Sequence, residues 1–76
     1  MDAPSDRPHT ELETHLMEAL ESRTVIGEAV GIMMERYGLD ADTALGALKR
    51  VSQQRNVKVR DLAAELVATG RVDGLT

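Results

Sequence analysis

The chain contains no cysteine, phenylalanine or tryptophan, and only one tyrosine among its 76 residues. Without cysteine it has neither a disulfide nor a thiolate–metal site with which to stabilise a small core. Without several aromatic rings it lacks the stacking platforms on which many proteins bind single-stranded nucleic acids. Association with a second chain is the remaining way for so short a protein to enlarge its core.

Long apolar segments are absent as well. No segment approaches the roughly 18 apolar residues of a membrane span, and the N-terminus has no apolar run that could serve as a signal peptide. We therefore expect a soluble, cytoplasmic protein that does not contact a membrane. The two prolines, Pro4 and Pro8, both lie in residues 1–9, which we expect to form a disordered lead-in.

Charge is distributed unevenly along the chain. The net charge is −4, yet no acidic residue occurs between Thr43 and Arg60. The basic residues of this block are Lys49, Arg50, Arg55, Lys58 and Arg60. A basic block in an acidic chain indicates a polyanionic partner, and the alternative is a solvated helix face.

The pattern of apolar residues predicts an all-α fold, a three-helix bundle with a long first helix. Thr10 and Glu13 can form a capping box at the start of that helix, and Gly38 can end it. No segment alternates with the period of two that strands require. We expect a three-helix domain over residues 10–70.

The second and third helices have their own start and stop signals. Asp40 can cap the second helix, Asn56 can end it in the left-handed conformation, and Gly70 can end the third. We expect residues 71–76 to form a flexible tail. The apolar positions of the second helix are Ala44, Leu45, Leu48, Val51 and Ser52. In the third helix one face carries Val59, Leu62, Ala63, Leu66 and Val67.

The first helix carries a coiled-coil pattern. Two series of residues are spaced by seven and offset by four, namely Leu12, Ala19, Ile26 and Met33, and Leu16, Arg23, Val30 and Tyr37. A helix over about 10–37 would be roughly 40 Å long, which is more than this domain can cover. We expect residues 10–25 to form a coiled-coil extension that pairs with another chain. The expected dimerisation residues are Leu12, Leu16, Ala19, Arg23 and Ile26.

Two glycines inside the first helix, Gly27 and Gly31, each cost about 1 kcal/mol relative to alanine. Either another helix approaches closely there, or an RNA or partner backbone lies against the smooth surface. Met33 and Met34 are interpreted as core-filling residues.

The sequence contains little that indicates catalysis or metal binding. His9 and His15 are too far apart to share one helical turn, and the acidic residues of the first helix read as a solvated face. A domain of three small helices offers no pocket for paired catalytic carboxylates. We expect neither an enzyme nor a cofactor or metal site.

The segment from Lys49 to Arg60 is the richest in binding chemistry. Lys49, Arg50, Lys58 and Arg60 suit phosphates, whereas the Ser, Gln and Asn side chains between them can contact base edges. The segment also crosses a junction between two helices, where the third helix presents its positive N-terminal end.

The order of residues adds a family resemblance. Residues 20–70 resemble the ANTAR domain, the RNA-binding module of bacterial transcription antitermination regulators. The matching string runs LESRTVIGEAVGIMMERYGL over residues 20–39 and continues with Asp42, Ala44-Leu45, Leu48, Ser52-Gln53, Asn56, Lys58 and Val59-Arg60-Asp61-Leu62-Ala63.

The resemblance implies a three-helix domain with a dimerising coiled coil. It also implies recognition of paired RNA hairpins in leader transcripts, which favours an antiterminator over a terminator. The positions of this chain that match the family pattern and that the resemblance assigns to the RNA surface are Arg23, Ala29, Gly31, Ser52, Gln53, Asn56, Lys58 and Arg60. The basic block adds Lys49 and Arg50 to this set, and we expect a homodimer or a heterodimer with sensor-bearing relatives.

The chain departs from the family pattern in three places. Glu28 stands where Gln is frequent, Val30 where a basic residue is frequent, and Leu45 where Phe is common. No sensor domain fits into residues 1–19, so we expect a stand-alone member or a fragment. Two other functions stay open: a helix-turn-helix DNA binder and a helical interaction module that binds no nucleic acid.

Overall fold

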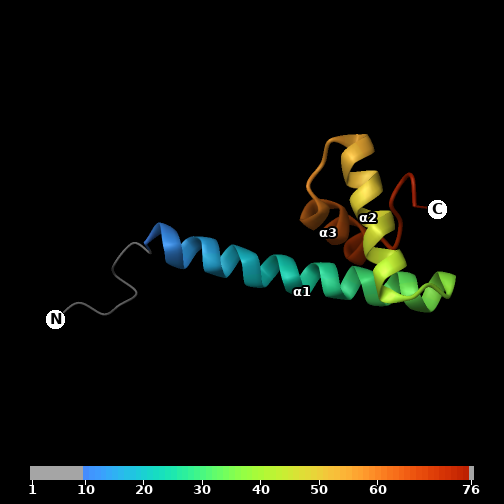
Figure 1. Cartoon of the computed structure of the whole chain (residues 1–76), viewed down its shortest axis with the longest axis horizontal. Helices are drawn as coiled ribbons and strands as arrows, with labels where there is room; N and C mark the ends of the chain where they lie inside the picture. Colours follow the sequence, from blue (N-terminus) through green and yellow to red (C-terminus); the bar gives the residue numbers. More distant parts are fainter. Residues whose placement is uncertain (1–9, 76) are drawn as a thin grey trace.

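Three helices make up the computed structural model, which describes residues 10–75 (Figure 1). They are α1 (Glu11–Tyr37), α2 (Ala41–Arg55) and α3 (Val59–Thr69). No strand occurs within residues 10–75, and the predicted all-α class is confirmed. The expected disordered lead-in, residues 1–9, lies outside the described residues.

The start and end of α1 follow the local signals. The Thr10 hydroxyl accepts a hydrogen bond from the Glu13 amide at 3.1 Å, and the Glu13 carboxylate accepts one from the Thr10 amide at 3.0 Å. Each bond satisfies an amide that the first helical turn leaves without a partner. Gly38, at φ 69°, ends the helix and donates to the Met34 carbonyl at 3.0 Å.

The ends of α2 and α3 were also predictable. The Asp40 carboxylate caps α2 by accepting from the Thr43 amide at 2.7 Å, and this hydrogen bond lowers the pKa of Asp40 below its ordinary value. Asn56 ends α2 with φ 56°, and Gly70 ends α3 with φ 75°. No side chain caps the start of α3, after Lys58.

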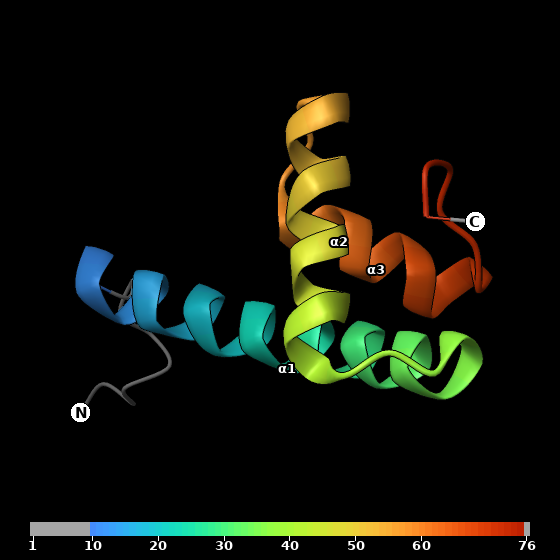
Figure 2. The same ribbon diagram turned by 45° about the vertical axis from the view of Figure 1, so that its right-hand side comes forward.

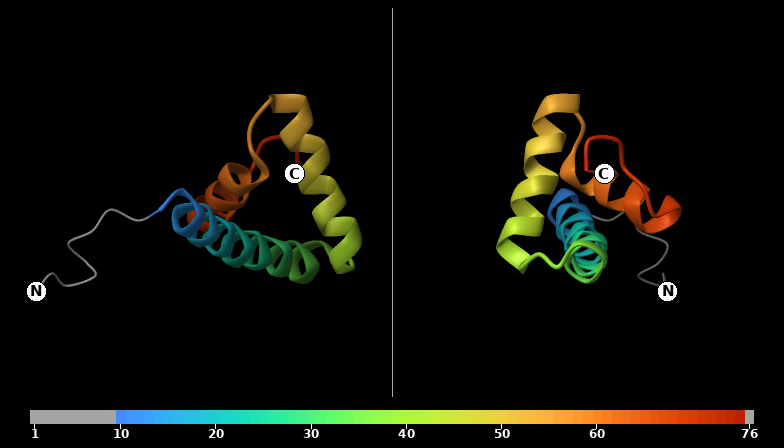
Figure 3. Two further views of the ribbon diagram at one scale, coloured as in Figure 1. Left: turned by 60° about the vertical axis from the view of Figure 1, so that its left-hand side comes forward. Right: turned by 90° about the vertical axis from the view of Figure 1, so that its right-hand side faces the viewer.

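All three helices contribute to one small core. Its buried apolar residues are Ala29, Met33, Ala44, Leu48, Val51, Leu62, Ala63, Leu66 and Val72. Each buried leucine contributes roughly 1.5–3 kcal/mol through removal of its surface from water. Figure 2 and the right view of Figure 3 show α2 and α3 on the same side of α1, so the opposite side of α1 is uncovered.

The molecule is elongated, with extents of 53 × 24 × 22 Å. The N-terminal part of α1 projects beyond the bundle as a single helix (Figure 1). Leu12 and Leu16 lie on this projection and are 69% and 55% exposed, and Leu20, where the projection meets α3, is 62% exposed. The projecting segment therefore leaves large apolar side chains in contact with solvent.

The burial of Val72, Val67 and Met34 differs from the sequence-based expectations. Val72 lies in the segment expected to be a flexible tail, yet it is 1% exposed and belongs to the core. The segment turns back after Gly70 and lies against Val51 of α2, so that a Cβ on Gly74 would be 3.3 Å from a Val51 methyl group. Conversely, Val67 is 39% exposed and Met34 is 40% exposed, and neither fills the core.

Candidate nucleic-acid interface

The outer face of α2 is polar and basic. Gly46, Lys49, Arg50 and Gln53 are spaced by three and four residues, which places them on one side of the helix. All four are exposed. The buried residues of α2 occupy the other side, so this basic face of α2 (Gly46, Lys49, Arg50 and Gln53) is directed to solvent.

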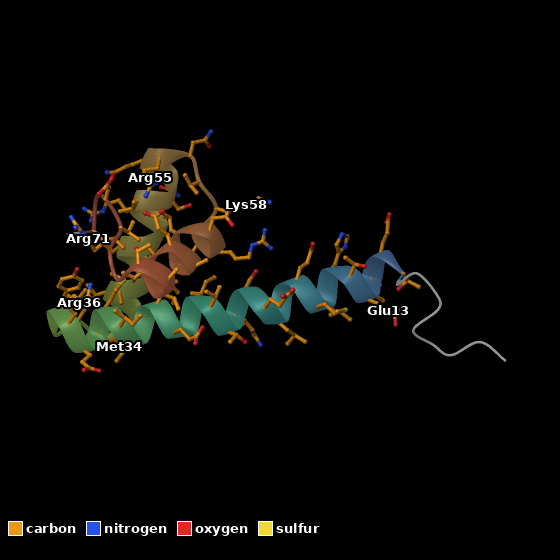
Figure 4. The ribbon with its side chains drawn as sticks, turned by 180° about the vertical axis from the view of Figure 1, so that it is seen from behind. Glu13, Met34, Arg36, Arg55, Lys58 and Arg71 are labelled. Carbon is orange, nitrogen blue, oxygen red and sulfur yellow. The ribbon has the colours of Figure 1, made fainter. Side chains whose placement is uncertain are left out.

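The basic face of α2 leads into a hollow at the junction with α3. This junction hollow has a volume of about 390 Å³ and is lined by Ser52, Gln53, Asn56, Val57 and Lys58. Gln53 belongs to both surfaces. The structure thus brings together four residues that sequence analysis selected, and Figure 4 shows Lys58 at the junction.

Hydrogen bonds fix the shape of the junction. The Val57 amide donates to the Ser52 carbonyl at 3.0 Å, and the Ser52 hydroxyl donates to the Val57 carbonyl. Asn56 completes the turn in the left-handed conformation, which asparagine tolerates better than most residues. Ser52 is half-buried and directs its hydroxyl to its own backbone. These hydrogen bonds therefore shape the turn that carries Gln53 and Asn56.

Arg55 faces away from this surface. Its guanidinium lies 3.5 Å from the Glu65 carboxylate of α3. The pair connects the end of α2 to the middle of α3 and locally neutralises the charge of Arg55. One of the five cations of the basic block is thus engaged with the protein itself.

Arg60 lies in a different environment. It borders an open cleft of about 560 Å³ between α1 and α3, which Glu21, Glu28 and Asp61 also line. Its guanidinium is 3.8 Å from the Asp61 carboxylate. Three carboxylates and one guanidinium line this α1–α3 cleft and give it a net negative charge, which disfavours a phosphate there.

The expected site residues of α1 do not join the junction hollow. Ala29 is 0% exposed, and its selection for the RNA surface is wrong because the side chain is part of the core. Arg23 and Gly31 are exposed on α1, but neither lines the junction hollow. Figure 4 shows Met34 on α1, well away from Lys58 at the junction.

Some features of the site were not found from the sequence. The pairing of Arg55 with Glu65 and the position of Arg60 in the cleft depend on how α3 packs, which local patterns do not specify. Gly46 did carry a signal, because a glycine inside a helix lowers helix stability. A Cβ at Gly46 would meet no atom within 4 Å, so packing within the chain does not explain it.

Two further properties bear on the site. Within residues 10–75 no group of three or more His, Cys, Asp or Glu side chains is arranged to hold a metal ion. None of the helices in the described part of the chain is both long and apolar enough to span a bilayer.

Comparison with known families gives a match over most of the chain. Residues 14–67 match the family described as the ANTAR domain, and this range includes the basic face of α2 and the junction hollow. No match was found among curated proteins or among solved structures.

Proposed function

The chain belongs to the ANTAR domain family of RNA-binding antitermination regulators, and from this premise we propose that it binds hairpin loops of leader transcripts as a dimer. Binding would favour an antiterminator and let transcription continue. The observation that carries the proposal is the continuity of exposed basic and amide side chains from α2 into the junction hollow.

The exposed residues divide into two chemical roles. Lys49, Arg50 and Lys58 supply positive charge for the phosphate backbone. Gln53 and Asn56 offer both donors and acceptors, which suit the edges of unpaired bases in a loop. Arg55 and Arg60 have a smaller part in this proposal, because Arg55 is paired with Glu65 and Arg60 lies near Asp61.

Gly46 extends this proposed surface. It lies one helical turn before Lys49 and Arg50 on the same face of α2. Without a side chain at this position, a phosphate or ribose could approach the helix backbone between the two cations. We therefore include Gly46 in the proposed RNA surface as a position of close approach.

A dimer would let two copies of this surface bind two hairpins. If the hairpins are linked in one transcript, the second contact forms at a high effective concentration and raises affinity by roughly two to four orders of magnitude. The exposed leucines on the projecting part of α1 support such a dimer.

The direct test uses tandem RNA hairpins with constant stems and randomised loops. The purified chain should select a defined loop sequence. It should bind the selected RNA more tightly than the same stems with scrambled loops, and more tightly than duplex DNA of the same sequence. Equal affinity for all three ligands would contradict loop recognition, and a preference for duplex DNA would support a helix-turn-helix function instead.

Antitermination needs a separate assay. The selected hairpins are placed before a terminator on a transcription template, and the full-length product is measured with and without the chain. We expect more read-through with the wild-type chain than with a Lys49→Ala/Lys58→Ala variant. Tight binding without any change in read-through would restrict the function to RNA binding.

A further inference from the structure

The α1–α3 cleft lies apart from the proposed RNA surface and contains apolar side chains from both of its helices. Leu20 and Val25 line it from α1, and Ala64 lines it from α3. Leu20 is 62% exposed although its side chain is large and apolar. A partner that covers Leu20 would gain free energy from removing this apolar surface from water. None of the residues that line the cleft belongs to the basic face of α2 or to the junction hollow.

Two carboxylates of the cleft are available to a partner. Glu21 and Glu28 are exposed on α1, and within residues 10–75 neither forms an ion pair. The Asp61 carboxylate, in contrast, lies 3.8 Å from the Arg60 guanidinium. The three carboxylates and one guanidinium of the cleft leave a net charge of −2, which a cationic partner would complement.

The spacing of the two exposed glutamates indicates the shape of that partner. Glu21 and Glu28 are seven residues apart on α1, which places them on one side of the helix and about 10 Å apart along its axis. A second helix presents its residues i and i+7 on one side at the same spacing. An extended peptide presents same-side residues about 7 or 13 Å apart, and neither spacing matches the glutamates.

The openness of the cleft favours a helix over a small molecule. Sites for small molecules are concave and enclose most of the surface of their ligand. The α1–α3 cleft instead leaves Leu20 mostly exposed on one wall. An amphipathic helix that lays its apolar side into a groove covers such an open surface.

We propose that the α1–α3 cleft binds a basic amphipathic helix of another protein. The helix would place Lys or Arg at positions i and i+7 opposite Glu21 and Glu28. Its apolar side chains at i+3 and i+4 would contact Leu20, Val25 and Ala64. Positions i, i+3, i+4 and i+7 share one side of a helix, so a single side meets both requirements. This inference goes beyond the proposed function, because the cleft and the RNA surface share no residue and both partners could be bound at once.

The test uses a synthetic helical peptide of about 15 residues. The peptide carries two lysines seven positions apart, leucines at i+3 and i+4 between them, and alanine and glutamine elsewhere. A control peptide of the same composition distributes the lysines and leucines around the helix. We expect the designed peptide to bind the chain at least tenfold more tightly than the control peptide, and its affinity should fall as the salt concentration rises.

Charge variants of the chain locate the contact. Glu21→Gln/Glu28→Gln should weaken binding of the designed peptide about tenfold, because two exposed ion pairs are lost. The matched control is Glu11→Gln/Glu18→Gln, which removes two carboxylates with the same spacing from a part of α1 outside the cleft. This control variant should bind the peptide like the wild-type chain.

A second pair of variants tests the apolar contact on α3. Ala64→Lys places a bulky cation inside the cleft and should abolish binding of the designed peptide. Ala68→Lys adds the same side chain one helical turn later, outside the cleft, and should leave binding unchanged. Both alanines are exposed, so both variants should fold, which circular dichroism checks.

Three results would overturn the proposal. Equal weakening in the two double variants would show that only the net charge of the chain attracts the peptide. Displacement of the peptide by an equal concentration of hexylamine would assign the cleft to a small amphipathic cation. A lower mass of Glu21→Gln/Glu28→Gln than of the wild-type chain by light scattering would assign the cleft to a second copy.

RNA binding is measured in separate titrations, because a basic peptide also binds RNA. A chain that binds the selected hairpin but not the designed peptide would contradict only the assignment of the cleft. A chain that binds the designed peptide but no hairpin would contradict the proposed function and leave the assignment of the cleft intact.

Discussion

Gly46 links the stability of α2 to the proposed RNA contact, and the two properties should respond to substitution in opposite directions. Gly46→Ala should stabilise the fold by about 1 kcal/mol, because alanine favours the helix and the site has space for a Cβ. The same substitution should weaken hairpin binding, and Gly46→Leu should weaken it further. Urea unfolding and RNA titration of each variant measure the two effects.

A control for added bulk is available on α3. Ala68 is exposed on another helix, so Ala68→Leu should leave RNA affinity unchanged. If Gly46→Leu binds RNA as tightly as the wild-type chain, the proposal that RNA approaches the helix backbone at Gly46 is wrong.

Asp40 gives the fold a pH dependence. Its folded-state pKa lies below the ordinary value of 3.8. The main cause is the hydrogen bond that the carboxylate accepts from the Thr43 amide, and a hydrogen bond with the Thr43 side chain lowers the pKa further. A depressed folded pKa means that the stabilisation is complete above the unfolded value and is lost as pH falls through the folded value. Thermal unfolding should show this loss in the acid range.

The Asp40→Asn variant isolates that effect. Asparagine also caps helices well but does not titrate. The wild-type melting temperature should therefore fall relative to that of Asp40→Asn as pH drops below about 4. If the melting temperatures of the two proteins differ by a constant amount across this range, protonation of Asp40 does not affect the stability of the fold.

Residues whose role depends on near neighbours were predictable from the sequence. The caps at Thr10, Asp40 and Asn56 each depend on groups within a few positions along the chain. The role of Ser52 was not predictable, because its hydroxyl could equally contact a base or the backbone. Only the path of the chain at the junction shows that it donates to the Val57 carbonyl.

At the scale of the element, the α2–α3 junction depends on that hydrogen bond. Ser52→Ala should destabilise the fold by about 1 kcal/mol, because a part-buried hydrogen bond is lost. It should also lower RNA affinity by releasing Gln53 and Asn56. Ser52→Thr retains a hydroxyl and should recover part of the affinity, whereas Gln54→Ala, on the exposed surface nearby, should change neither property.

If Ser52→Ala loses RNA affinity and amide exchange at Val57 stays as slow as in the wild type, Ser52 contacts RNA directly. Faster exchange at Val57 together with weaker binding supports the positioning role.

The segment after α3 gives a second comparison at this scale. Val72→Ala should destabilise the fold by roughly 1–3 kcal/mol, since Val72 is buried. Val67→Ala removes the same atoms from a partly exposed position and should lower the free energy of unfolding by a smaller amount. Urea unfolding of both variants checks the order, and a larger cost for Val67→Ala would contradict the burial of Val72.

The sequence predicted the opposite order for these valines. A helical repeat identifies the apolar side of α3 but not where that side ends, and Val67 is 39% exposed. The return of residues 71–75 to the core depends on packing against Val51, which no local pattern specifies.

At the scale of the whole molecule, the fold places the five cations of the basic block in different environments. The basic face of α2 and the junction hollow carry Lys49, Arg50 and Lys58. The α1–α3 cleft combines Arg60 with Glu21, Glu28 and Asp61. The basic block in the sequence pointed to a polyanion, but it could not show that two of its five cations lie beside carboxylates.

The sequence predicted the length of α1 but not which side of the helix packs against α2 and α3. A seven-residue repeat serves equally for an intramolecular core and for a coiled coil. The structure assigns Ile26 and Met33 to contacts within the chain.

The measurement that tests the central claim most directly is the affinity for the selected hairpin over a series of salt concentrations. We expect Lys49→Ala/Lys58→Ala to bind weakly and to reduce the slope of log K against log salt by about 2, one for each lost phosphate contact. Arg55→Ala, which removes a cation already paired with Glu65, should change the slope little. If the double variant and Arg55→Ala have the same slope, or if the double variant binds like the wild type, the basic face of α2 and the junction hollow are not the RNA site.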